Sequence, residues 1–124
     1  MEFIANPLSV EEQNLFENGR NLFNEGKYWH AHESWEDLWN MLKKREAPQP
    51  EILLIQGLIQ TAALLFHYEK GNLIGVQKQW EKLQPKLIGW KLAWGIDINK
   101  HLHTIKTFTQ SSGTTSNLPE HVQI

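Results

Sequence analysis

The chain has 124 residues, a hydrophobic fraction of 40%, a net charge of -2 and no cysteine. This length and apolar content fit one domain with its own core. The lack of cysteine excludes disulfides, thiolate catalysis and cysteine-ligated metal sites, and it fits a reducing compartment. Because there is no basic stripe and no cationic amphipathic helix, we expect neither a nucleic-acid partner nor a membrane partner. No signal-peptide pattern opens the chain, so we expect a cytoplasmic protein.

The first half of the chain predicts two helices. Ser9 and Glu12 form a capping box that starts the first helix, and Gly26 is a typical residue just beyond a helix end. The second helix carries the segment 28–39 and ends among the basic residues 43–45, which suit the negative end of a helix dipole.

The segment 50–70 predicts a third helix that is apolar nearly all round. Pro50 suits the first helical position and Gly71 suits the position after the end. The segment contains too many polar residues to span a bilayer, so we expect a buried core helix at the centre of the fold.

Two further helices are predicted after Gly71. Asn72 caps a fourth helix, in which Pro85 removes an amide donor and should kink or split the helix. Asp97 caps a shorter fifth helix, and no segment has a convincing strand pattern. Beyond Ser111 the composition turns to serine, threonine, glycine and asparagine.

These elements predict an all-α fold, an antiparallel bundle of about five helices built from two helical hairpins plus a short C-terminal helix. We expect residues 1–111 to form the single helical-bundle domain. Residues 112–124 are expected to form a flexible C-terminal tail outside the core.

An internal repeat separates packing residues from the others. The pattern Gly26-x-Tyr28-x-x-Ala31-x-x-x-Trp35-Glu36-x-Leu38 returns 45 residues later as Gly71-x-Leu73-x-x-Val76-x-x-x-Trp80-Glu81-x-Leu83. His32 and Glu33 become Gln77 and Lys78 in the second copy, so the histidine and glutamate are not required merely to pack such a hairpin. The small and aromatic positions also resemble tetratricopeptide helix pairs.

Polar residues on the second and third helices fall on stripes that antiparallel packing would bring face to face. His32 and Glu36 are four residues apart and share a helix face at the edge of the apolar side. A polar line on the third helix must find hydrogen-bond partners, and it consists of Gln56, Gln60 and His67. We therefore predict one enclosed polar site in which these side chains converge: His32, Glu33, Glu36 and Gln60.

The chain resembles the DUF309 family through two motifs. The first is Gly19-x-x-Leu22-Phe23-Asn24-x-Gly26-x-Tyr28-x-x-Ala31-His32-Glu33-x-Trp35-Glu36-x-x-Trp39. The second is Gln56-Gly57-Leu58-Ile59-Gln60-x-Ala62-Ala63, followed by His67. The resemblance covers roughly residues 12 to 108. It implies a small all-α protein whose function is not established, and such proteins are sometimes labelled predicted metal-dependent hydrolases.

One hypothesis for the polar site is a metal-dependent hydrolase. An imidazole and a carboxylate at i and i+4 can bind one divalent ion such as zinc, with a third ligand from the facing helix. The metal set would be His32, Glu36 and His67 or Gln60, and the catalytic set His32, Glu33 and Glu36. Glu33 would act as general base. The motif departs from His-Glu-x-x-His because its last position is Glu36.

Three other interpretations stay open. The cluster can be a hydrogen-bonded network that rigidifies helix packing. It can bind a small molecule without metal, and the residues that would contact this molecule are Gln56, Gln60, His67, Trp29 and Trp39. The chain can also be a non-enzymatic, tetratricopeptide-like module that binds a peptide, and a homo-oligomer is compatible with each interpretation.

The remaining histidines are predicted to lie outside the site. His30 and Asp37 point to the solvated side of the second helix. His101 and His103 are two residues apart, so they face different ways, and we expect both at the surface. The tryptophans are expected to belong mostly to the core.

Overall fold

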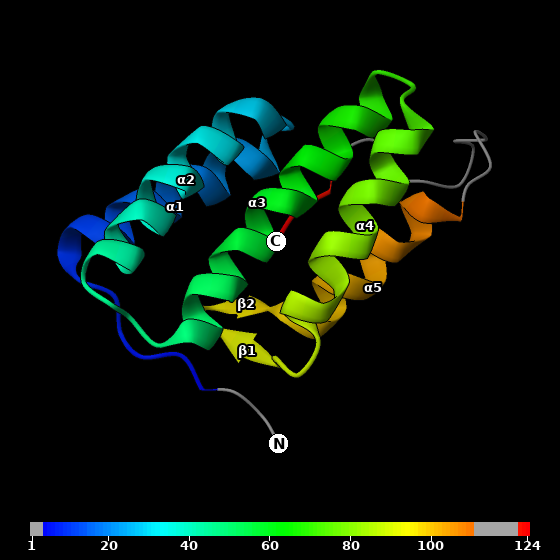
Figure 1. Cartoon of the computed structure of the whole chain (residues 1–124). Coiled ribbons are helices and arrows are strands. Elements are labelled where there is room, and N and C mark those ends of the chain that lie inside the picture. The colour runs from blue at the N-terminus through cyan, green and yellow to red at the C-terminus, as the bar shows by residue number, and fades with distance from the viewer. Residues whose placement is uncertain (1–3, 111–121) are drawn as a thin grey trace.

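The computed structural model describes residues 4–110 and 122–124. In these residues there are five helices and one two-stranded hairpin, as drawn in Figure 1. The elements are α1 (Val10–Asn24), α2 (Tyr28–Lys44), α3 (Gln49–Glu69), α4 (Leu73–Leu87), β1 (Leu92–Ala93), β2 (Ile96–Asp97) and α5 (Ile98–Thr109). The predicted all-α class and helix number are confirmed.

Each helix packs against the next along the chain: α1 against α2, α2 against α3, α3 against α4 and α4 against α5. In the view of Figure 1, α2, α3 and α4 lie in front, with α1 behind α2 and α5 behind α4. α3 is long and apolar enough to cross a membrane by length and composition, but most of its apolar stretch is buried between its neighbours. It is the central core helix that the sequence predicts.

The helix ends follow local chemistry. Ser9 and Glu12 form the predicted capping box of α1, and Asn72 and Asp97 cap α4 and α5 through their side-chain oxygens. Gly26 and Gly71 follow α1 and α3 with φ of 80° and 74°, a region in which a Cβ atom is strained.

Two local predictions need correction. Pro85 does not split α4, because the helix continues to Leu87 and ends only two residues after the proline. The segment after α4 forms a small antiparallel hairpin, in which β1 pairs with β2. Its turn holds Trp94 and Gly95 at φ of 49° and 83°, so backbone geometry rather than strand propensity makes the hairpin.

The motif residues of α1 and α2 are mainly packing residues. The indole of Trp35 is fully buried and lies directly against Gly19, where an added Cβ would be 2.3 Å from Trp35 Nε1. The same nitrogen donates a hydrogen bond to the carbonyl of Phe16 at 3.1 Å. Only a residue without a side chain allows the two helices to approach this closely.

The last three residues pack against the bundle, contrary to the expectation of a tail outside the core. Val122 is buried, and its N–H donates to the hydroxyl of Tyr28 at 3.1 Å. The side chain of Asn24 accepts from the N–H of Ile124 at 2.7 Å and donates to its carbonyl at 3.1 Å. Arg20 Nε donates to the same carbonyl at 2.9 Å. The rest of the predicted tail, up to residue 121, lies outside the described residues.

Candidate functional site

On α2, the predicted pair of His32 and Glu36 is formed. His32 Nε2 lies 3.3 Å from Glu36 Oε2, and the Glu36 side chain keeps about half of its surface exposed (48%). Trp29 stacks on the imidazole, with ring centroids 5.1 Å apart and 17° between the planes. The other ring nitrogen, His32 Nδ1, is buried without a hydrogen-bond partner among the described residues.

On α3, Gln60 is oriented by a lysine from α4. Lys86 Nζ donates to Gln60 Oε1 at 2.9 Å and to the carbonyl of Lys82 at 2.9 Å. Because an ammonium group can only donate, the amide oxygen of Gln60 must face Lys86 and its NH2 group must face away. Desolvation, and then the nearby charge of Lys82, lowers the pKa of Lys86.

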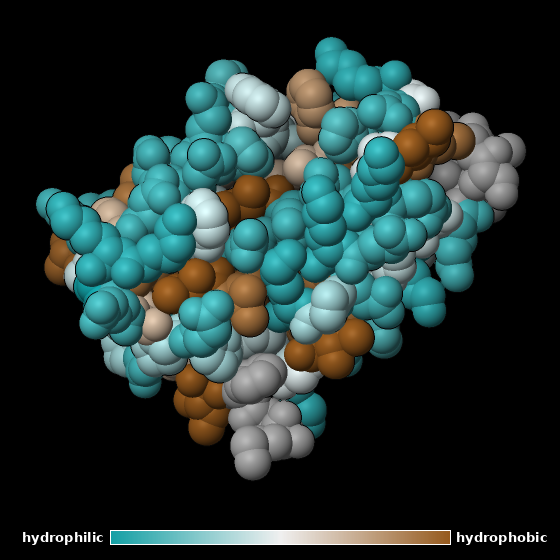
Figure 2. All heavy atoms as spheres, viewed as in Figure 1, coloured by the Kyte–Doolittle hydropathy of each residue, from teal (hydrophilic) through white to brown (hydrophobic). Residues whose placement is uncertain are grey.

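Side chains from three helices line one open hollow of about 290 Å³. Its lining residues are His32, Glu36 and Trp39 from α2, Gln56, Ile59, Gln60 and Ala63 from α3, and Gln79 and Lys82 from α4. In the view of Figure 2, hydrophobic residues show between the hydrophilic side chains over α2 and those over α4. Of the four residues predicted to converge, His32, Glu36 and Gln60 line this hollow and Glu33 does not. Gln56 also lines it, and α4 adds Gln79 and Lys82, two residues that the sequence did not indicate.

The two polar stripes meet without bonding to each other. Among the described residues, no hydrogen bond joins His32 or Glu36 to Gln56 or Gln60. Trp39 Nε1, a group that can only donate, is likewise buried without a partner there. A sealed packing network would satisfy these groups internally, so the arrangement differs from the network hypothesis.

Two predicted site residues point elsewhere. Glu33 Oε1 lies 3.2 Å from Nδ1 of His30, and both side chains are well exposed. His67 Nδ1 lies 3.3 Å from Asn72 Nδ2 at the end of α3 and does not line the hollow. Glu33 is therefore not placed as a general base beside His32, and His67 does not complete a ligand set with it.

The proposed metal set is consequently not assembled. Within residues 4–110 and 122–124, no group of three or more histidine, aspartate or glutamate side chains lies close enough to hold a metal ion. The pair of His32 and Glu36 alone offers two ligands, fewer than the three protein ligands typical of a catalytic zinc site.

The prediction that His101 lies at the surface is wrong. His101 is 3% exposed, and burial lowers its pKa to about 3. The spacing from Ile98 to His101 and Leu102 already placed this histidine on the apolar stripe of the fifth helix. His103 is exposed, as predicted, and so is His30.

A model of the DUF309 family, described as a domain of unknown function, matches residues 16–79. The chain belongs to the DUF309 family. The match covers α1 from Phe16 onward, all of α2 and α3 and the first part of α4, and it includes every α2 and α3 residue that lines the hollow. No curated protein and no solved structure matches the chain. The DUF309 match therefore covers both motifs and assigns no function, so the chemistry rests on the residues themselves.

The residues that sequence reasoning missed at this hollow are on α4: Gln79 and Lys82 line it, and Lys86 orients Gln60. Lys82 and Lys86 are four apart and share one helix face, but Lys82 falls beyond the part of the chain that matches DUF309. Nothing in the sequence indicates that this face turns toward the stripe of α3.

Proposed function

We propose that this DUF309 protein binds a small molecule of the amino-acid or dipeptide class in the hollow between α2, α3 and α4, without a metal. One observation supports this most. Polar side chains from three helices line one hollow, and among the described residues no hydrogen bond joins those of α2 to those of α3 across it. The volume of about 290 Å³ is near the lower end of typical ligand pockets, roughly 300–1,000 Å³.

The charges on the two sides of the hollow select the ligand class. Glu36 on α2 is an acceptor for an ammonium group or an amide N–H. Lys82 on α4 is a donor for a carboxylate, and the NH2 group of Gln60 can donate to a carbonyl or carboxylate. A ligand that carries both signs of charge satisfies both sides at once.

The floor of the hollow supplies apolar contact. Ile59 and Ala63 of α3 lie between the polar side chains, and Trp39 gives an aromatic wall. Lys43 Nζ lies 3.4 Å from the centroid of the Trp39 ring, a cation–π contact that helps to hold the indole in place. A short aliphatic or aromatic side chain of the ligand fits this surface.

The experiment is a thermal-shift titration with the free amino acids and glycylglycine as probes. A ligand that binds only the folded state raises the melting temperature by mass action. We expect a shift for at least one probe, and we expect its N-acetylated and amidated forms to lose the shift because each lacks one charge.

Two pairs of variants test the location. Glu36→Gln and Lys82→Gln remove one charge on each side of the hollow and should abolish the shift. Asp37→Asn and Lys78→Gln remove exposed charges on the same two helices outside the hollow, and they should keep it. The proposal fails if no probe shifts the melting temperature, or if the shift persists in both hollow variants.

A further inference from the structure

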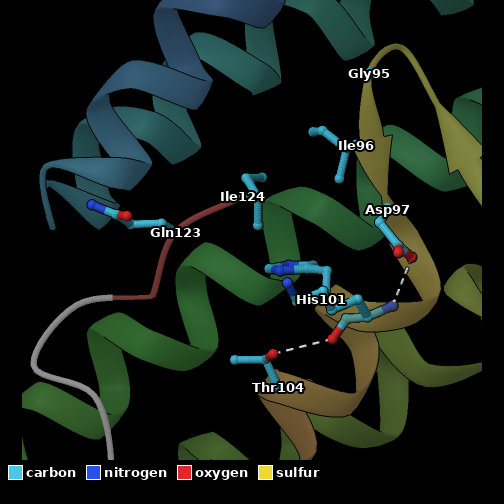
Figure 3. Close-up of a pocket in the computed structure, with 8 residues that line it drawn as sticks. Gly95, Ile96, Asp97, His101, Thr104, Gln123 and Ile124 are labelled. Carbon is cyan, nitrogen blue, oxygen red and sulfur yellow. Dashed lines mark hydrogen bonds between the residues drawn. The ribbon is translucent and has the colours of Figure 1, made fainter.

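A second hollow of about 190 Å³ lies on the other side of the core, between α5 and the C-terminal residues. Its lining residues are Gly95, Ile96, Asp97, Lys100, His101, Thr104, Gln123 and Ile124. Figure 3 shows the imidazole of His101 between helix α5 and the segment that carries Gln123 and Ile124. None of these residues takes part in the hollow proposed for ligand binding above.

The hydrogen bonds around His101 fix its tautomer. The hydroxyl of Thr61 donates to the carbonyl of Leu58 at 2.8 Å, which uses its single hydrogen. Thr61 Oγ1 also lies 3.1 Å from His101 Nε2, so in this contact the oxygen must accept and Nε2 must carry the proton. With the ring neutral, Nδ1 is left as a bare acceptor.

Among the described residues His101 Nδ1 has no partner, and two polar side chains that line the same hollow bond elsewhere. Asp97 Oδ1 accepts from the N–H of Lys100 at 2.9 Å, and the Thr104 hydroxyl donates to the carbonyl of Lys100 at 3.1 Å. These two bonds are the dashed lines in Figure 3. The nitrogen itself is buried, in a residue that is only 3% exposed.

We propose that this hollow binds a neutral, single-ring molecule whose hydroxyl or N–H group donates to His101 Nδ1. The acceptor requires a donor, and the apolar walls given by Ile96 and Ile124 favour a ring. A cavity of roughly 150 Å³ is enough to hold benzene, so the space is adequate. A charged ligand is disfavoured, because burial keeps His101 uncharged at neutral pH and would also desolvate the ligand's charge.

The wall that can yield to a ligand is the C-terminal segment. The other lining residues belong to β2, its turn or α5, whereas Gln123 and Ile124 lie outside any helix or strand. The hydrogen bonds of Ile124 to Arg20 and Asn24 use only its main-chain atoms. A small shift of this segment gives a ligand access to the imidazole edge while the helices stay in place.

The test is NMR of the histidine ring nitrogens in the full chain, with phenol and toluene as probes. The two molecules have nearly the same shape, but only phenol can donate. We expect phenol to move the Nδ1 resonance of His101 saturably, while His32 stays fixed and toluene leaves Nδ1 in place. The free protein should show the Nε2-protonated tautomer.

Two results would overturn the proposal. One is a free protein in which Nδ1 is protonated, so that it offers no acceptor, or in which Nδ1 is already hydrogen-bonded, which would mean a bound water only. The other is an absent response to phenol, or an equal response to toluene. In a parallel thermal-shift assay, His101→Gln should lose the phenol effect and the exposed control His103→Gln should keep it. Because the NMR arm needs no variant, it decides the question even if His101→Gln fails to fold.

Discussion

Replacing Gly19 with alanine should destabilise the protein, although alanine has a higher helix propensity than glycine. An added Cβ would lie 2.3 Å, 2.4 Å and 2.8 Å from Nε1, Cδ1 and Cε2 of Trp35. Carbon atoms pack at roughly 3.5–4.0 Å, so the indole would have to move by about 1 Å. The ring is fully buried between Phe16 and Phe23 and has no free direction in which to move.

The magnitude follows from three effects. Gly→Ala within a helix gains about 1 kcal/mol of unfolding free energy. Overpacking a core costs about 1–3 kcal/mol. Displacing the ring also stretches the bond from Trp35 Nε1 to the Phe16 carbonyl, and an unsatisfied buried group costs about 1–3 kcal/mol. We expect Gly19→Ala to lose about 3 kcal/mol, a large part of the roughly 5–15 kcal/mol typical of a domain.

Gly57→Ala is the matched control. Its Cβ would meet Leu87 Cδ2 at 2.7 Å and Cγ at 3.1 Å, in an aliphatic side chain that makes no hydrogen bond, so the net loss should be about 1 kcal/mol, smaller than for Gly19→Ala. The assay is urea unfolding followed by far-UV circular dichroism, since Trp35 fluorescence would itself respond to the clash. A Gly19→Ala variant as stable as the wild type, or equal to Gly57→Ala, would refute the reasoning.

Four further predictions concern stability and pH. Val122→Ala should cost about 1–2 kcal/mol, since about two buried carbons are lost, and a thermal melt identical to wild type would show that the segment does not dock. Glu12→Gln should lower stability by about 1 kcal/mol at pH 7. The hydrogen bond from Arg45 holds the pKa of Glu12 below its usual value, so this difference should vanish as pH falls through that pKa. Burial raises the pKa of Glu51, because it disfavours the charged carboxylate in the folded state. Glu51→Gln should therefore stabilise the protein, by an amount that grows as pH rises through that raised pKa. Urea melts across this pH range in which the variant is less stable than the wild type would contradict this. The unfolded chain protonates His101 near pH 6.5 and the folded chain only near 3, so this histidine should lower stability by about 1.4 kcal/mol for each pH unit as pH falls between these values. In urea melts across this range, His101→Gln should lack that share of the slope.

Local chemistry determined where the helices begin and end. The capping box of Ser9 and Glu12, the caps at Asn72 and Asp97, and the glycines after α1 and α3 act through bonds and backbone angles within a few residues. Such interactions can be read from the sequence without knowledge of the rest of the chain. The apolar stripes then predicted the class of fold, because each helix must bury its stripe against a neighbour.

The composition of the candidate site depended on tertiary structure. The sequence placed His32, Glu36, Gln56 and Gln60 on facing stripes, and these do line one hollow. It could not predict that His67, near the end of α3, would lie outside this hollow, because the axial offset of two packed helices is set by side-chain packing along their whole contact. The same packing brings Lys82 of α4 to the hollow, from a helix whose polar face carries no distinguishing pattern.

The sequence alone therefore determined the five helices, their caps and the stripe on which each polar residue lies. Only the tertiary structure decided which stripes share a surface, which residues His101 packs against and where residues 122–124 lie. His101 and Val122 illustrate the difference. The burial of each depends on contacts with residues far away along the chain, Thr61 and Phe23 for the histidine and Tyr28 for the valine. Such contacts are specified by the assembled core and by no local segment.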